Sequence, residues 1–224
     1  MTCQAVRVGS RITGALLDAL AVLSPVDCAG CGSADRSLCE DCQRELEPAV
    51  TPRGLPDGST VYTALRYEGV VRGTLLALKE SGRTDMVKPL SIPLAAALAR
   101  AAQPGAEFLG VPTSRAAWRR RGYDPVALLC KRAGYDPAKV LRSSRATLRQ
   151  KTLGSDDRAR NLHESMTSRV SLRGRSFILV DDVVTTGATL NEAARAVRAA
   201  GGEVAGFAAL AFTPRLFGSS PSIP

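Results

Sequence analysis

The segment from residue 177 to 189 (FILVDDVVTTGAT) constrains the fold more than any other part of the chain. Its four leading apolar residues predict a short strand that is buried on both faces, as strands are in a parallel sheet. Two adjacent carboxylates, Asp181 and Asp182, follow at the carboxyl end, and a loop of small hydroxylated residues then leads into a helix. Ligands of parallel α/β sheets bind at this edge, so the segment predicts a ligand site.

The loop itself has the composition of a phosphate site. Backbone N–H groups in such a loop and at the start of the next helix bind anions, and Gly187 allows close approach of the backbone. The hydroxyls of Thr185, Thr186 and Thr189 can donate further hydrogen bonds. The paired carboxylates would then face sugar hydroxyls or a magnesium ion. The alternative is an acidic strand end before an ordinary capped helix, which leaves two costly carboxylates at a buried edge unexplained.

Strands and helices alternate from residue 60 onward, which predicts an α/β fold with a parallel sheet flanked by helices. We expect strands at 61–67, 107–111, 177–180 and 204–212, and helices at 70–79, 94–102, 126–133 and 190–200. An N-terminal helix and a cysteine module fill residues 1–50, and the Pro- and Gly-rich stretch 51–59 is expected to be a linker. The main domain then spans 60–215, with a loose tail at 216–224.

Four of the six cysteines form two Cys-x-x-Cys pairs separated by seven residues. Each pair places two thiolates on one tight turn, and two such turns complete a tetrahedral zinc site. Four sulfur ligands leave no open position, so the predicted zinc ion is structural. The alternatives are a disulfide pair and a redox or iron–sulfur role. The predicted ligands are Cys28, Cys31, Cys39 and Cys42.

Positive charge is concentrated in one stretch. Residues 112–160 hold 13 basic and 4 acidic side chains, whereas the rest of the chain has 17 of each. Such a field attracts polyanions, either nucleic acid or a small phosphorylated ligand, although a solvated arginine-rich surface is an equal alternative. No apolar stretch approaches the ~20 residues of a membrane helix. We therefore expect a cytoplasmic protein without membrane insertion.

All thirteen positions of the segment 177–189 resemble the binding motif for phosphoribosyl pyrophosphate (PRPP) of type I phosphoribosyltransferases. The resemblance implies that Asp181 and Asp182 hold the ribose hydroxyls and that PRPP binds with Mg²⁺. It also implies a cradle for the 5′-phosphate, made of Thr185, Thr186, Gly187, Ala188 and Thr189.

Two further segments narrow the resemblance. One is the run from Val111 to Arg115 with the later Arg-Arg-Arg-Gly-Tyr at 119–123, and the other has the pattern Arg145-x-Thr-x-x-Gln-x-x-Leu before Arg158-x-x-Asn. Together with the cysteine quartet they resemble the ComF family of competence-associated proteins. The resemblance implies that the stretch 145–161 is the flexible loop of related transferases. The chain departs from the family pattern at 124–125, where Asp-Pro replaces the Asn-Gln that is usual in ComF-like sequences.

This resemblance supplies candidate groups for the pyrophosphate. Thr113 and Ser114 are expected to bind it, and the candidate catalytic cations are Lys79, Arg115, Arg145 and Arg158. For Lys79 a solvated lysine at a helix end is an equal alternative. Three functions stay open: a phosphoribosyltransferase of unknown acceptor, a non-catalytic sensor of PRPP or a nucleotide, and an accessory protein that handles single-stranded DNA for the DNA-uptake machinery.

Overall fold

A computed structural model describes residues 26–34, 36–143 and 165–214 of the chain. Its centre is a five-stranded sheet in the order β1-β2-β7-β6-β3. The last four strands of that order are parallel, and β1 joins the edge antiparallel. The parallel α/β fold expected from the sequence is therefore confirmed. The strands are β1 Thr51–Gly54, β2 Thr60–Arg66, β3 Ala106–Gly110, β6 Ser176–Val184 and β7 Glu203–Phe212.

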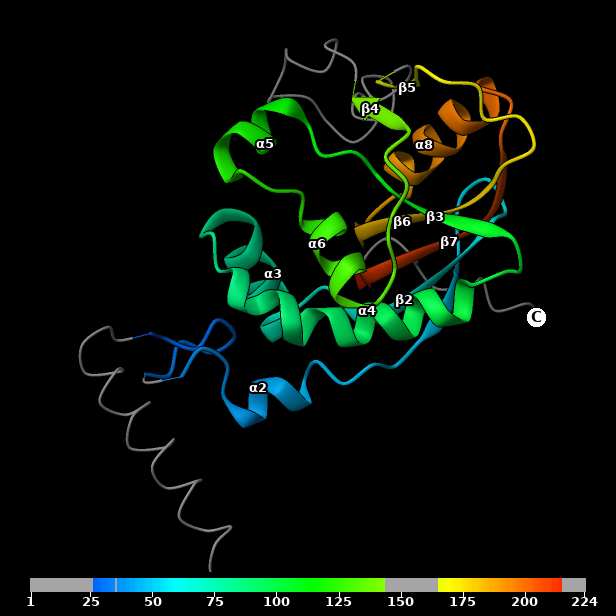
Figure 1. Ribbon diagram of the computed structural model, residues 1–224. Coiled ribbons are helices and arrows are strands. Elements are labelled where there is room, and N and C mark those ends of the chain that lie inside the picture. Colours follow the sequence, from blue (N-terminus) through cyan, green and yellow to red (C-terminus); the bar gives the residue numbers. More distant parts are fainter. Residues whose placement is uncertain (1–25, 35, 144–164, 215–224) are drawn as a thin grey trace, which may run out of the picture.

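Helices cover both faces of the sheet (Figure 1). The helices α3, α4 and α6 share one hydrophobic cluster with the sheet, and α8 shares a second cluster with the opposite face. A small two-stranded antiparallel sheet, β4 paired with β5, packs beside α8. The helices are α2 Glu40–Arg44, α3 Gly69–Glu80, α4 Val87–Ala101, α5 Arg115–Arg121, α6 Pro125–Arg132 and α8 Ala188–Ala199, with the 3-10 turn η1 Thr84–Met86; the small sheet is β4 Leu141–Ser143 and β5 Met166–Ser168.

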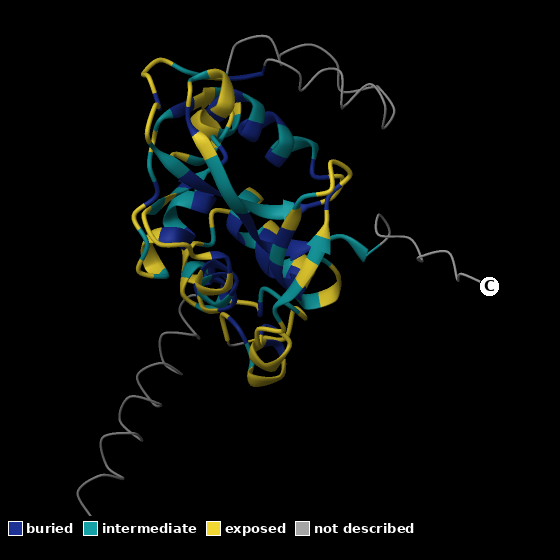
Figure 2. Ribbon diagram, turned by 90° about the vertical axis from the view of Figure 1, so that its right-hand side faces the viewer, coloured by how far each residue is buried: buried dark blue, intermediate teal, exposed yellow. Residues whose placement is uncertain are grey.

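Strand β6 separates the two clusters. Successive side chains of a strand point to opposite faces, and Phe177 and Leu179 accordingly pack in the cluster under α8. Ile178 and Val180 pack in the cluster on the other side. All four side chains are fully buried, and the central strands lie within the dark interior of Figure 2. The strand continues to Val184, so the two aspartates belong to the strand and do not follow it.

The cysteine module is continuous with the main body. Cys28 and Cys42 lie in the same hydrophobic cluster as Val71 and Leu75 of α3. Beyond the end of α3, the Arg83 guanidinium donates to the carbonyl oxygens of residues 27 and 37, at 2.7 and 3.1 Å, on both sides of the first cysteine pair. The module is therefore packed on α3 and has no hydrophobic core separate from it.

The stretch 51–59, expected to be a linker, begins with strand β1. Its four residues pair with β2 in register from Thr51 opposite Thr63 to Gly54 opposite Thr60. The structure differs from the expectation because proline is tolerated on an edge strand, where its missing N–H is not needed by a neighbour. The expected N-terminal helix, the loop 145–161 and the tail 216–224 lie outside the described residues, apart from residue 26.

None of the helices in the described ranges combines the length and hydrophobicity needed to span a bilayer.

Gly73 provides a test of the contact between α3 and the cysteine module. A Cβ atom at this position would lie 2.8 Å from the carbonyl oxygen of Ala29, which is backbone and cannot rotate away. Alanine normally stabilises a helix by ~1 kcal/mol relative to glycine. We expect Gly73→Ala to lower the free energy of unfolding instead, by about 1–3 kcal/mol, because of overpacking. Urea unfolding monitored by circular dichroism measures it.

The matched control is Gly54→Ala, because nothing lies within 4 Å of a Cβ at Gly54. This change should stay within about 0.5 kcal/mol of the native chain. A Gly73→Ala variant that is as stable as the native protein would show that the helix and the module are not in tight contact.

Candidate functional site

A cavity of about 380 Å³, here called the sheet-edge cavity, lies where β2, β3 and β6 approach their carboxyl ends. Tyr67 follows β2 and Val111 follows β3, and both line the cavity. Helices α3 and α6 and the loop after β6 close its sides. The lining residues are Tyr67, Lys79, Val111, Pro112, Thr113, Arg121, Pro125, Val126, Asp181, Asp182, Val183, Thr185 and Thr189.

Six of the residues singled out from the sequence meet at this cavity. They come from three distant parts of the chain: the end of α3, the loop after β3, and the segment from β6 to α8. These residues are Lys79, Thr113, Asp181, Asp182, Thr185 and Thr189.

The other predicted residues do not line it. Ser114 caps α5, where its hydroxyl accepts from the backbone N–H of Ala117 at 3.2 Å. Arg115 faces a neighbouring cavity. The predicted cations Arg145 and Arg158 lie outside the described residues.

An ion pair joins the two sides of the cavity. The ammonium Nζ of Lys79, in the last turn of α3, lies 2.8 Å from Oδ2 of Asp182, and the two side chains are only 27% and 13% exposed. Asp182 lies on the same face of β6 as Ile178 and Val180, so it faces the side of the sheet that α3 covers. Burial alone would lower the pKa of Lys79, but the carboxylates of Asp182 and Asp181 outweigh it and raise the pKa. Lys79 is thus part of the site and not a solvated helix-end lysine.

The neighbouring carboxyl, Asp181, has a different environment. Burial and then the negative charge of Asp182 raise its pKa to about 7, against partial compensation by Lys79. Its Oδ1 accepts a hydrogen bond of 2.8 Å from the backbone N–H of Asp182. Asp181 therefore changes its charge near neutral pH, and a bound cation would favour its ionised form. Asp182 beside it is held by the ion pair with Lys79.

The turn after β6 is built for close packing. Gly187 caps α8 with φ of 75°, a left-handed conformation that favours glycine. A Cβ on it would lie 2.7 Å from the Leu55 side chain, which packs against the turn from the β1–β2 connection. The hydroxyl of Thr186 accepts from the N–H of Ala188 at 3.3 Å and holds the turn. Thr186, Gly187 and Ala188 therefore shape the loop, while Thr185 and Thr189 face the cavity at the positive end of the α8 dipole.

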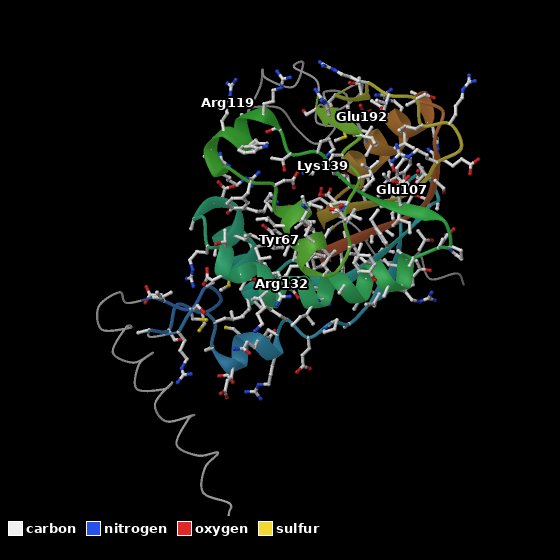
Figure 3. The ribbon with its side chains drawn as sticks, in the orientation of Figure 1. Tyr67, Glu107, Arg119, Arg132, Lys139 and Glu192 are labelled. Carbon is white, nitrogen blue, oxygen red and sulfur yellow. The ribbon has the colours of Figure 1, made fainter. Side chains whose placement is uncertain are left out.

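Sequence reasoning missed Arg121 and Tyr67 as lining residues. Arg121 ends α5, and its Nη1 donates to the Lys79 carbonyl at 3.3 Å, while its buried Nε has no partner among the described residues. The Tyr123 hydroxyl donates to the carbonyl of Leu78, so this loop holds the end of α3 at two points. Figure 3 shows Tyr67 near α6 and the end of α3. The arginine run at 119–121 was the available signal, but nothing local shows which arginine turns inward.

An ion pair between buried Glu192 and partly exposed Arg195 ties β5 to α8. Glu192, which is 5% exposed, accepts from the backbone N–H of Met166 at 2.9 Å and from Arg195 at 2.7 Å. Arg195 in turn donates to the Met166 carbonyl at 2.8 Å. Glu192 is labelled in Figure 3. Strand β5, which follows the expected loop 145–161, is thus fixed to α8. This helix begins at the turn formed by residues 185–189, here called the threonine turn.

The four predicted zinc ligands form one cluster. The sulfur atoms of the two cysteine pairs all lie within 4.8 Å of one another. A Cβ on Gly30 would lie 2.6 Å from the sulfur of Cys42, so only glycine fits between the pairs. Burial would raise the pKa of Cys28, but backbone N–H groups that point at its sulfur lower it to about 6. Four cysteine sulfurs in this arrangement could hold a tetrahedral Zn²⁺ ion with a structural role.

Comparison with known proteins finds relatives of the chain and a domain model that matches part of it. A model of the phosphoribosyl transferase domain matches residues 119–216, which include β6, the threonine turn and β7. The chain is 28% identical over 186 residues to DNA utilization protein YhgH of Escherichia coli K12, which covers 75% of this chain and 82% of that protein. It is 27% identical over 177 residues to competence protein ComFC of Bacillus subtilis, with 75% and 70% covered.

Among solved structures, adenine phosphoribosyltransferase of Trypanosoma brucei is similar over 83% of this chain and 88% of that chain, at 14% identity and a TM-score of 0.36.

The raised pKa of Asp181 predicts a pH-dependent effect of Asp181→Asn. Between about pH 4 and 7 the folded chain keeps a proton at Asp181 that the unfolded chain has released, so this group makes the native protein less stable as pH rises through that window. The asparagine variant lacks this penalty. Its free energy of unfolding should match the native value near pH 4 and exceed it by about 1–3 kcal/mol above pH 7. Urea unfolding at several pH values measures it.

Asp182→Asn is the matched control, since it removes the partner of Lys79. We expect it to destabilise the protein at neutral pH. A loss of stability in both variants, independent of pH, would contradict the assigned environment of Asp181.

The cysteine cluster predicts one zinc ion per chain. Cys42→Ser should abolish stoichiometric zinc and lower the melting temperature, because the free energy of metal binding contributes to folding. Cys130→Ala is the control, since Cys130 is buried in the core away from the cluster. Metal analysis of the purified variants should give one zinc for the control and less than a tenth of that for Cys42→Ser. Equal zinc in both would contradict the assignment.

Proposed function

We propose that the sheet-edge cavity binds PRPP with magnesium and that the protein transfers the phosphoribosyl group to a nitrogen acceptor. The match of residues 119–216 to a model of the phosphoribosyl transferase domain and the similarity to competence protein ComFC support this proposal. One observation carries the proposal. A carboxyl pair, a threonine turn and two cations from distant segments line one cavity at the carboxyl edge of the sheet.

Each lining group suits a part of this ligand. Carboxylate oxygens of Asp181 and Asp182 accept hydrogen bonds from the two adjacent ribose hydroxyls. The hydroxyls of Thr185 and Thr189, with the N-terminus of α8, suit the 5′-phosphate. On the opposite side, Thr113 and the guanidinium of Arg121 suit the pyrophosphate, because the buried Nε of Arg121 has no hydrogen-bond partner in the part of the chain that the structure describes.

Oxygen ligands are what Mg²⁺ prefers, and the two aspartates provide them at the cavity wall. Bound magnesium would neutralise negative charge on the pyrophosphate.

The proposed reaction is a substitution at C1′ of the ribose. The bond from C1′ to the pyrophosphate oxygen breaks, the acceptor nitrogen forms a bond to C1′, the acceptor loses its proton to water, and pyrophosphate leaves. Because charge accumulates on the leaving group, fixed donors and cations next to it lower the barrier. Lys79 has a positioning role in this scheme, since it holds Asp182 in a single orientation.

A second function, in DNA handling, is favoured by the names of the relatives together with the basic stretch 112–160. A sensor that binds PRPP or a nucleotide without turnover shares the same cavity. Release of pyrophosphate distinguishes the transferase from the sensor. A cytoplasmic location belongs to this proposal, because cysteine thiolates are maintained in a reducing compartment.

Isothermal titration with PRPP, with and without magnesium, tests the proposal. We expect Asp182→Asn to weaken binding at least tenfold, because it removes charge from the ribose contact and frees Lys79. The control is Glu203→Gln at the opposite end of β7, which should stay within twofold. The variant Lys79→Met should also bind less tightly. Lack of PRPP binding by the folded, zinc-loaded chain would refute the proposal.

Ribose 5-phosphate and 2-deoxyribose 5-phosphate sharpen this test. If the carboxyl pair binds the two adjacent hydroxyls, the native protein should bind the deoxy sugar several-fold more weakly than ribose 5-phosphate. The Asp182→Asn variant should bind the deoxy sugar as weakly as the native protein does. Pyrophosphate release in the presence of a panel of nitrogen bases and amines then reports transfer.

A further inference from the structure

We infer that a second cavity, next to the first, binds a nucleotide through its phosphate and its base. This α5–β4 cavity has a volume of about 560 Å³. It is lined by Gly110, Pro112, Thr113, Arg115, Trp118, Asp124, Ala127, Leu128, Lys131, Pro137, Ala138, Lys139, Leu141, Arg142 and Ser143. Pro112 and Thr113 also line the sheet-edge cavity, so the two cavities are separated by a single loop.

The charge of the cavity is unbalanced. Four cations line it, and Asp124 is the one acidic residue of the lining. That carboxylate accepts from the N–H of Ala127 at 3.1 Å and caps α6, so it is already engaged. In the described ranges, Asp136 is the one carboxylate paired with a cation of this cavity, 3.8 Å from Lys131. The remaining cations, Arg115, Lys139 and Arg142, therefore create an anion-binding surface.

An aromatic ring stands beside these cations. Trp118 is 53% exposed although it is the largest side chain of α5, a helix in which no residue is buried. The cavity wall also has an apolar part, formed by Leu128, Pro137 and Ala138. Figure 3 shows Lys139 between α5 and the central strands.

The combination selects the class of ligand. A simple polyanion would need only the cations, and an apolar ligand would not need them. A flat ring that stacks on indole and a phosphate that lies on lysine or arginine occur together in a nucleotide. Free nucleotides and single-stranded DNA both offer this chemistry.

Trp118 is the only tryptophan of the chain, so its fluorescence reports on this cavity directly. The experiment titrates the full-length, zinc-loaded protein with thymidine 5′-monophosphate and, separately, with a twelve-residue oligo-dT. We expect saturable quenching. Quenching by both probes assigns the site to free nucleotides as well as strands, and quenching by oligo-dT alone assigns it to a strand. Quenching by neither probe overturns the inference.

Charge variants test where the phosphate binds. Lys139→Glu should weaken binding of the quenching probe roughly five- to tenfold and reduce the salt dependence of the oligo-dT affinity. The control is Lys88→Glu, an exposed position of α4 that changes the net charge equally and lines neither cavity. An equal loss in both variants would mean a general effect of charge and would overturn the assigned site.

The base contact is tested with labelled oligo-dT by fluorescence anisotropy. Trp118→Leu should lower affinity about tenfold, the usual effect of losing one stacking platform. The fold should be unaffected, because α5 buries no residue. If inorganic polyphosphate binds as tightly as oligo-dT and Trp118→Leu changes nothing, the cavity does not bind the base and the inference is wrong.

A last variant separates the two cavities. Thr185→Val combined with Thr189→Val alters the sheet-edge cavity, and both residues lie outside the lining of the α5–β4 cavity. Quenching should stay within twofold of the native value. Loss of quenching would place the nucleotide at the threonine turn and overturn the inference. A loss of quenching in this variant would not refute the proposed function, because PRPP binding is measured independently by calorimetry.

Discussion

The ion pair between Lys79 and Asp182 is the interaction on which the arrangement of the site depends. A strand buried on both faces carries two carboxyls toward its end, where unpaired charges would be costly. A lysine at 2.8 Å offsets that cost for one of them, and the other keeps a raised pKa. Removal of one partner of such a pair usually costs more than the pair contributes. The position of α3 is therefore a requirement for β6 to carry aspartates near its carboxyl end, as well as a matter of hydrophobic packing.

The cysteine module helps to fix the position of α3. It packs against the first half of the helix, and neither Gly73 of α3 nor Gly30 of the module has room for a side chain at this contact. Arg83 holds the same module just after the helix ends, and Arg121 holds the helix carbonyl at Lys79. Both ends of α3 are thus fixed, one by the cysteine module and the other by the loop that borders the cavity. A rigid helix between them links the stability of the cysteine cluster to the geometry of the ion pair, although the two sites share no residue.

Local patterns predicted the parts of this fold that depend on local chemistry. The apolar run 177–180, the threonine turn and the spacing of the cysteines each indicated their structures because periodicity and turn residues act over a few positions. Strand β1 was missed because Pro52 and Gly54 have the composition of a linker, while their pairing with β2 is a tertiary effect. The inward turn of Arg121 was not predictable either. It depends on a carbonyl 42 residues away in the chain, which no local pattern encodes.

The uneven charge of the sequence also has a structural explanation. In the sheet-edge cavity the cations Lys79 and Arg121 face two aspartates, so the charges are nearly matched, and specificity must come from the geometry of hydroxyls and donors. In the α5–β4 cavity four cations face one acid that already caps a helix. Four cations of the stretch 112–143 therefore lie around the α5–β4 cavity, across the loop that bears Thr113 from the site proposed for the sugar phosphate. The cations that line the two cavities are different residues, so two phosphate-bearing ligands bound side by side would not compete for the same cations.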